Sequence, residues 1–150
     1  MDIVTALGAL ASVQSAITIT SPLNIGIRRV YIVPPNSQTQ LTDLPCWING
    51  WTLTGVRRKT TGGVIDQSYT IHSQLYVEDA SIERACLIAS AFLQPFIIAL
   101  QRNIGLSGTV AESNLRGGDP TLALLERGGK GYPGLDLFID VVLRNSVVYA

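Results

Sequence analysis

The sequence predicts an α+β domain in which two main helices pack on one face of an antiparallel or mixed β-sheet. Two segments repeat apolar residues at three- and four-residue steps, which is the spacing of one face of a helix. Other segments alternate apolar and polar residues, and a polar turn containing glycine separates two of them as in a hairpin. Strands joined by hairpins need a second layer from other elements, so we expect the helices to supply it. A chain of 150 residues is expected to form a single domain, 1–150.

The first helix is predicted to begin after Asp2, which can cap it, and to end near Ala16. The residues that share its apolar face are Ile3, Ala6, Leu7, Leu10 and Val13. Beyond it the composition changes to serine, proline, asparagine, glutamine and threonine. This change predicts a long polar connector at about 17–45, with one short strand near 30–33.

A hairpin is predicted from residue 47 to Glu78, with its turn at 59–63. Side chains alternate between the two faces of a strand, so the second strand has one core face and one wetter face. The core face is expected to hold Tyr69, Ile71, Ser73, Leu75 and Val77, and the other face Thr70, His72, Gln74 and Tyr76.

A long apolar helix is predicted at 81–104, with Asp79 or Ser81 as its cap. Pro95 lies in its interior and is expected to bend the axis or to divide the helix into two segments. Apolar residues also occur outside the main stripe, at Leu87, Ala91, Ile97 and Ile98. Hydrophobicity around the circumference indicates a helix that is covered on more than one side.

The remaining chain is predicted to contain a strand at 109–115, a flexible loop at about 117–134 and a final strand at 135–143. Glycine and proline at 117–120 and glycine at 128–131 predict the loop, which holds a short apolar patch at 122–125. The final strand alternates most clearly, with Leu135 and Leu137 on one face and Asp136 and Phe138 on the other.

The composition favours contact with another protein. Hydrophobic residues make up 47% of the chain and charged residues only 15%, against roughly 25% in an average soluble domain. Eleven basic and eleven acidic side chains cancel, so the whole chain has no field that would gather nucleic acid or an anionic membrane. The longest apolar run, 85–100, is shorter than the roughly 20 residues that span a bilayer. We therefore expect a buried helix in a soluble protein without a membrane partner, and no segment marks the chain for secretion.

Residues with catalytic or metal-binding chemistry are few. His72 is the only histidine, and Cys46 and Cys86 lack the second pair of ligands that a zinc site needs, so both are expected to be buried free thiols. A small hydrolase using His72 with an acid such as Asp66 is the weakest of the readings considered. Asp136 and Asp140 share a strand face about 13 Å apart and are expected to face solvent or to pair with arginine or lysine. We predict no enzyme activity, catalytic residue, cofactor or metal.

Two basic clusters remain, one of them Arg57, Arg58 and Lys59 at the predicted hairpin tip and the other Arg28 with Arg29. The simpler interpretation is that both lie in solvated loops. The alternative is that several copies in a ring multiply the tip cluster into a positive collar that touches phosphates without sequence preference.

Trp47 and Trp51 fall on the same face of the predicted strand. Aromatic residues often anchor protein interfaces, and they also fill cores. Both interpretations remain open for this pair.

The whole arrangement resembles the tail terminator and head-to-tail joining proteins of long-tailed bacteriophages. The resemblance includes the short amphipathic N-terminal helix and the direct passage from strand to long apolar helix. The segments that carry it are 30–35 (VYIVPP), 44–47 (LPCW), 70–78 (TIHSQLYVE), 131–134 (GYPG) and 135–141 (LDLFIDV). It covers nearly the full length of the chain.

The resemblance implies a structural virion protein of the tail and neck, assembled in the host cytoplasm. Such a subunit forms a ring, usually hexameric, that caps the tail tube and joins it to head connector or adaptor proteins. It implies a channel through which DNA passes, and under the alternative interpretation of the tip cluster Arg57, Arg58 and Lys59 would face its lumen. Ring contacts are heterologous, and the sheet edge and the residues Leu87, Ala91, Ile97 and Ile98 are the expected patches. The connector and the loop at 117–134 would be ordered mainly by neighbouring copies.

Two alternatives remain. One is another neck or tail-completion adaptor protein, which would also be a small α+β ring subunit. The other is a small α+β module that binds a ligand between its sheet and its helices.

Overall fold

The computed structural model describes residues 1–59, 63–117 and 120–146, apart from the side chain of Lys59. It contains two helices and a mixed sheet, which confirms the predicted α+β class. The helices are α1 (Ile3–Ser15) and α2 (Ile82–Arg102). The strands are β1 (Thr18–Ile19), β2 (Ile25–Gly26), β3 (Arg29–Tyr31), β4 (Cys46–Lys59), β5 (Val64–Tyr76), β6 (Glu112–Leu115), β7 (Thr121–Arg127) and β8 (Lys130–Ser146).

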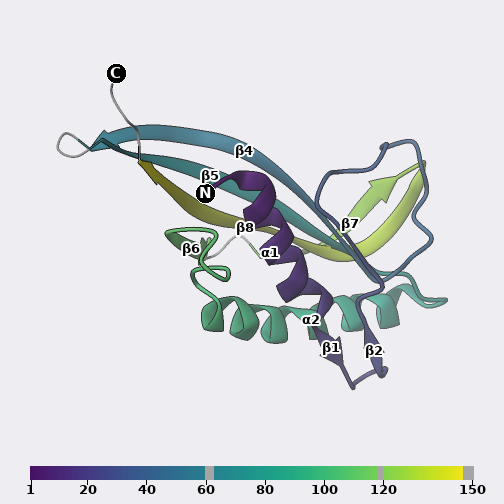
Figure 1. The fold of residues 1–150 in the computed structure, drawn as a ribbon. Helices are drawn as coiled ribbons and strands as arrows, with labels where there is room; N and C mark the ends of the chain where they lie inside the picture. Colours follow the sequence, from purple (N-terminus) through teal and green to yellow (C-terminus); the bar gives the residue numbers. More distant parts are fainter. Residues whose placement is uncertain (60–62, 118–119, 147–150) are drawn as a thin grey trace.

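The main sheet has the order β3-β4-β5-β8-β6, and β7 pairs with the first part of β8. Within the described residues of this sheet, β3 and β4 run parallel and every other pair is antiparallel. Both helices lie on the same side of the sheet, where α1 crosses the long strands and α2 runs along their lower edge (Figure 1). This is the predicted layer arrangement.

The core fills the space between the helices and the sheet. Trp47 of β4 packs against Phe96 of α2 with 4.9 Å between ring centroids, and both side chains are fully buried. The alternation predicted for β5 and β8 is confirmed at Ile71, Leu75, Leu135 and Leu137, which are buried. It is wrong for Tyr76, which was expected on the wetter face but is 2% exposed, because a second buried cluster covers it there. The fully buried large side chains include Leu7, Leu10, Ile88, Phe92 and Leu100.

Helix α1 begins and packs as predicted. The backbone N–H of Thr5 donates to Asp2 Oδ1 at 2.8 Å, which satisfies one of the free donors at the helix start. Ala6, Leu7 and Leu10 face the core. At the end of α1, the buried Gln14 meets Asn49 and Ser73 of the sheet through side-chain hydrogen bonds.

Helix α2 is one continuous helix, with Ser81 as its cap and Pro95 inside it. The Ser81 side chain accepts a hydrogen bond from the backbone of Arg84. By length and composition alone, the 21-residue helix α2 is long and apolar enough to cross a membrane. The apolar run 85–100 by itself was too short to suggest this. Here its apolar stripe packs on the sheet, so α2 forms part of the core.

The flexible loop predicted at about 117–134 is wrong for most of its length. Residues 121–127 form β7, and β8 begins at Lys130. Gly128 and Gly129 have φ angles of 58° and 75°, the left-handed conformation that a two-residue hairpin turn requires. The glycines that suggested a break in the chain therefore form a tight turn. Residues 118–119 of that segment lie outside the described part.

The connector predicted at 17–45 contains β1, β2 and β3, and it also bonds to the rest of its own chain. The Tyr132 hydroxyl accepts from the backbone of Leu41 at 3.1 Å. The Arg127 side chain donates to the Pro35 carbonyl at 3.1 Å. These bonds hold the connector against the β7–β8 hairpin. A second buried cluster joins the connector to β4, β5 and β8. Its members are Leu41, Leu44, Cys46, Ile48, Tyr76 and Tyr132.

Strand β8 pairs with β7 and with β5, and the two pairings overlap at residues 134–136. Residues before Gly134 pair with β7 only, whereas Gly134 itself also pairs with Tyr76 of β5. A Cβ atom at this position would lie 1.9 Å from the Leu75 carbonyl oxygen. Only glycine fits such a close approach of two backbones.

Candidate functional site

The distal halves of β4, β5 and β8 form a projecting arm. We define the arm as residues 51–58 of β4 with 64–70 of β5 and 140–146 of β8. It extends beyond α1 and α2, so neither helix covers its β4 margin (Figure 1). Every residue from Trp51 to Arg58 is exposed. On β4 the sheet thus continues past the part that the core covers, whereas Val141 and Leu143 of β8 remain buried.

The helix-side face of the arm is apolar along β4. Trp51, Leu53 and Val56 are 51%, 44% and 60% exposed. Their partners on β5 are Ile71, Tyr69 and Gln67, which continue the face that carries the core. Trp51 also contacts the ring of Tyr69 edge-on, with 5.5 Å between centroids. Trp47 therefore belongs to the core, while Trp51, on the same face, is left at the surface.

The outer margin of β4 is unpaired in the described residues beyond Ile48, where β3 ends. An open strand edge can accept another strand, and proteins commonly block it with a bulge or with charge. Here the register shifts between Leu53 and Gly55, and two arginines follow. These features disfavour strand addition along the arm and leave its face as the accessible surface.

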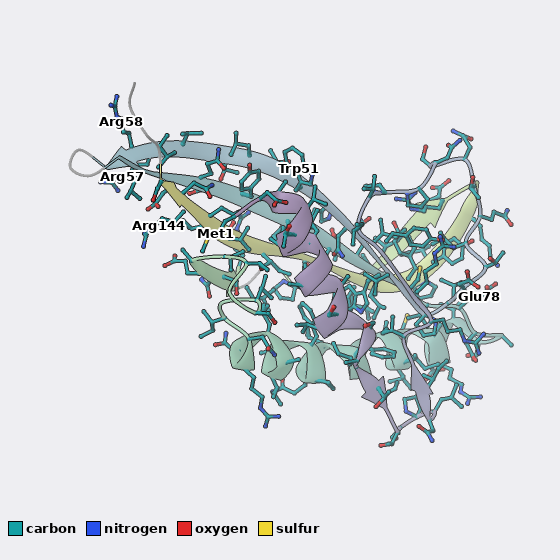
Figure 2. The ribbon with its side chains drawn as sticks, viewed as in Figure 1. Met1, Trp51, Arg57, Arg58, Glu78 and Arg144 are labelled. Atoms are coloured by element: carbon teal, nitrogen blue, oxygen red, sulfur yellow. The ribbon has the colours of Figure 1, made fainter. Side chains whose placement is uncertain are left out.

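The structure places the predicted basic cluster at the tip of the arm. Arg57 and Arg58 are exposed and point to opposite sides of β4 (Figure 2). Arg57 pairs in register with Asp66 on the outer face, and Arg58 pairs with Ile65 on the helix side. Lys59 ends β4, but its side chain and the turn residues 60–62 lie outside the described part. Arg144 also lies on the outer face, where it binds Asp66 at 2.8 Å.

A groove opens at the opposite end of the molecule, between the start of α2 and β7. Its volume is about 280 Å³, and it is lined by Ile82, Cys86, Leu122, Ala123, Leu124 and Pro133. Ile82 and Leu124 are 70% and 69% exposed, so the walls themselves are open to solvent. Leu122 and Leu124 lie on the helix-side face of β7, because they pair with Leu135 and Pro133. We call this feature the α2/β7 groove.

The four helix residues expected to form a subunit interface do not make one surface. Leu87 and Ile98 are 55% and 42% exposed, whereas Ala91 and Ile97 are half-buried and pack partly on neighbouring residues. Leu87, Ala91 and Ile98 share a stripe at steps of four and seven residues. Ile97 precedes Ile98 and therefore lies about 100° around the helix from it.

The outer face of the sheet carries a polar network. His72 contacts Asp136 and stacks on Phe138 with 4.5 Å between ring centroids. Arg116 binds Asp140 at 2.8 Å, and Thr70 donates to the same carboxylate. The expectation that Asp140 pairs with a basic residue is confirmed.

Electrostatics at Asp140 follow from these contacts. Partial burial alone would raise the pKa of Asp140, but hydrogen bonds from Arg116 and Thr70 outweigh it and hold the pKa below its usual value. The carboxylate therefore stays ionised and acts as a structural partner of Arg116.

The structure does not bring His72 and Asp66 together. His72 contacts Asp136, while Asp66 binds Arg144 near the tip of the arm. Within the described residues, no three histidine, cysteine, aspartate or glutamate side chains gather as metal ligands would.

The two cysteines are free, as predicted, but only one is fully buried. Cys46 is 0% exposed, and burial raises the pKa of its thiol to about 12. Cys86 is half-buried and lines the α2/β7 groove. The prediction of two buried thiols is therefore wrong for Cys86, because its helix packs only one flank on the sheet.

Sequence reasoning missed the groove. Its signal was present in Leu122 and Leu124, which lie two residues apart as on one face of a strand. The glycines on either side of this segment favoured a loop over a strand in the sequence analysis.

Comparison of the chain with protein-family models and with curated proteins found no match. The arm and the α2/β7 groove are the two surfaces from which its function is inferred.

Proposed function

We propose that this protein is a ring-forming tail terminator of a long-tailed bacteriophage, which caps the tail tube and joins it to the head connector. The observation that carries the proposal is the apolar helix-side face of the arm, with Trp51, Leu53 and Val56 exposed side by side on one strand. Contiguous apolar surface of this kind marks a site of protein contact.

The position of the arm supports assembly into a ring. It extends away from the core, whereas the α2/β7 groove lies at the other end (Figure 1). Two different open surfaces on one chain allow head-to-tail contacts between copies. Such contacts form a ring when successive rotations from copy to copy add up to a full turn. The resemblance of the sequence to tail terminators favours a hexamer.

The basic tip supports contact with DNA in the channel. Arg57 lies on the outer face of the arm, with Arg144 and Asp66 nearby. Six copies would repeat this tip around one axis and present phosphates with a positive collar. The partners in this proposal are the tail tube protein, the connector or adaptor proteins, and the genome, which is bound without sequence preference. The site of action is the neck of the virion.

The geometry gives less support to a ligand held between sheet and helices. That space is filled by Trp47, Phe92 and Phe96, all fully buried. Another neck or tail-completion adaptor would share the ring and the basic tip, so binding to the tail tube is what distinguishes a terminator.

The test measures the mass of the purified protein by light scattering and images it with purified tail tubes by negative stain. We expect rings with six times the 16.1 kDa mass of one chain, or density capping one end of the tubes. Binding to head connectors but never to tubes would instead identify an adaptor. A monomer that ignores both would contradict the proposal.

A further inference from the structure

The arm and the α2/β7 groove are complementary in polarity. The arm presents Trp51, Leu53 and Val56 as a protruding apolar row on one strand. The groove is a hollow of about 280 Å³ with apolar walls, flanked by Ile82 and Leu124. A ridge and a hollow of the same character bury apolar surface when they meet, at roughly 25 cal/mol for each Å² removed from water.

They are also complementary in charge. Arg58 lies on the same helix-side face of the arm as Val56, and Arg57 is adjacent on the other face. At the groove, Glu83 follows Ile82 on the exposed flank of α2, and Glu126 lies two residues beyond Leu124 on the same face of β7.

The basic residues near the groove either point away from it or already contact another residue. Lys130 binds Glu78, and Arg127 contacts Tyr76 and the Pro35 carbonyl. Arg84 lies about 200° around α2 from Ile82, on the flank away from Cys86. The rim of the groove is therefore acidic where the arm is basic.

One molecule cannot satisfy both surfaces by itself. Arg57 and Arg58 lie at one end of the molecule and Glu78, which precedes α2, at the other (Figure 2). The open surfaces of the same chain therefore require two copies.

We propose that the helix-side face of the arm of one copy docks into the α2/β7 groove of the next copy. This inference deepens the proposed function and rests on it, since it names the contact that builds the ring. Arg58 lies at the interface beside Glu83 and Glu126, and Arg57 faces away from it toward the channel. The bulge between Leu53 and Gly55 keeps the contact face-on, without a continuous sheet between copies.

The proposal is tested with two variants that each destroy one surface. The arm variant is Trp51→Ser with Val56→Ser, and the groove variant is Leu122→Ser with Leu124→Ser. All four side chains are 47% exposed or more, so circular dichroism should show an unchanged fold. Each variant alone should remain monomeric at concentrations where the wild type assembles, with affinity weakened about tenfold or more.

Mixing the two variants is the decisive measurement. The arm variant retains a groove and the groove variant retains an arm, so one intact contact forms between them and cannot propagate. We expect a one-to-one pair with twice the 16.1 kDa mass of a chain. Two folded monomers that ignore one another, while the wild type forms rings, would overturn the arm-and-groove contact but leave the tail terminator proposal standing. A wild type that stays monomeric alone and with tail tubes would overturn both.

A charge exchange provides an independent check. Arg58→Glu and Glu83→Lys should each weaken association severalfold, and the two together should restore part of it. Arg57→Glu is the matched control, because its side chain points to the other face; it should weaken DNA binding and leave assembly nearly unchanged. Leu87→Ser with Ile98→Ser should also leave assembly intact. Disassembly by this last variant, with assembly retained by the arm variant, would move the interface to the exposed stripe of α2.

Discussion

Gln14 and Asn49 exchange two side-chain hydrogen bonds where the end of α1 meets β4. Gln14 Nε2 donates to Asn49 Oδ1 at 3.2 Å, and Asn49 Nδ2 donates to Gln14 Oε1 at 2.8 Å. Both residues are 0% exposed, and Ser73 donates to the same Asn49 oxygen at 2.5 Å. This amide pair fixes where α1 lies on the sheet, because a shift of the helix would leave buried polar groups without partners.

Replacing Gln14 by leucine should therefore destabilise the fold even though leucine is apolar. The substitution leaves the buried Asn49 Nδ2 without its acceptor and removes one of the two donors to Asn49 Oδ1. We therefore expect a loss of about 1–3 kcal/mol in the free energy of unfolding, measured by urea denaturation. The double variant Gln14→Leu with Asn49→Leu should lose less than the sum of the two single variants. Strict additivity would show that the two amides do not act as a pair.

A methyl group at position 134 should be among the most damaging small changes in this chain. Gly134→Ala places its Cβ atom 1.9 Å from the Leu75 carbonyl oxygen, so β5 and β8 must separate. We expect a loss of at least about 3 kcal/mol, measured by thermal or urea unfolding. Gly8→Ala is the matched control, because nothing lies within 4 Å of a Cβ atom in that part of α1. It should raise stability by about 0.5–1 kcal/mol. Equal effects of both variants would contradict the close approach.

The Asp140–Arg116 pair should make stability depend on pH in the acid range. The pKa of Asp140 is lower in the folded protein than that of an ordinary aspartate in the unfolded chain, so the unfolded chain binds this proton more readily. The contribution of the carboxylate is present above the unfolded value and is lost as the pH falls through the folded one. Asp140→Asn should thus cost stability at pH 7 and cost much less near pH 3, a difference that urea titrations at both pH values can measure. Because the side chain is 44% exposed, the effect should be modest. The same loss at both pH values would argue against an ionic contribution.

The two thiols should react at very different rates. Cys46 is fully buried with a pKa of about 12, so little of the reactive thiolate exists at pH 8. Cys86 is half-buried at the α2/β7 groove, and N-ethylmaleimide should modify it first in the folded monomeric arm variant. Mass spectrometry after digestion identifies the labelled site, and urea should make both thiols reactive. Modification of Cys46 in the folded chain at the rate of Cys86 would contradict the packing of β4.

The sequence predicted the two main helices and the hairpin because their signals are local. Alternation in 71–77 and 135–143 determines which face is buried, and the cap at Asp2 and the turn before Val64 mark boundaries. Strand β7 was missed because Gly128 and Gly129 suit a flexible segment as well as a tight turn, and only the pairing of β7 with β8 decides between them. Long-range pairing of this kind leaves little trace in a single sequence.

The existence of the arm could have been anticipated from the lengths of the predicted elements. Which of its side chains are exposed could not. Helix α2 has 21 residues and is about 32 Å long, whereas β4 has 14 residues and is about 46 Å long. A strand that is longer than the helix running along it can extend beyond the layer that covers it. Alternation alone gave Trp47 and Trp51 the same environment, because it identifies a face and not how far the covering layer reaches along it.

Strand β8 gives the molecule a mechanical property as well as a shape. It runs without interruption from Lys130 at the β7 hairpin to Ser146 in the arm, so the two ends of the protein are joined by one extended backbone. A pull between those ends loads its ladder with β5 in shear, in which neighbouring hydrogen bonds resist together instead of opening one at a time. A chain built in this way would transmit tension along a single strand with little stretching, even while the loops on either side of it yield.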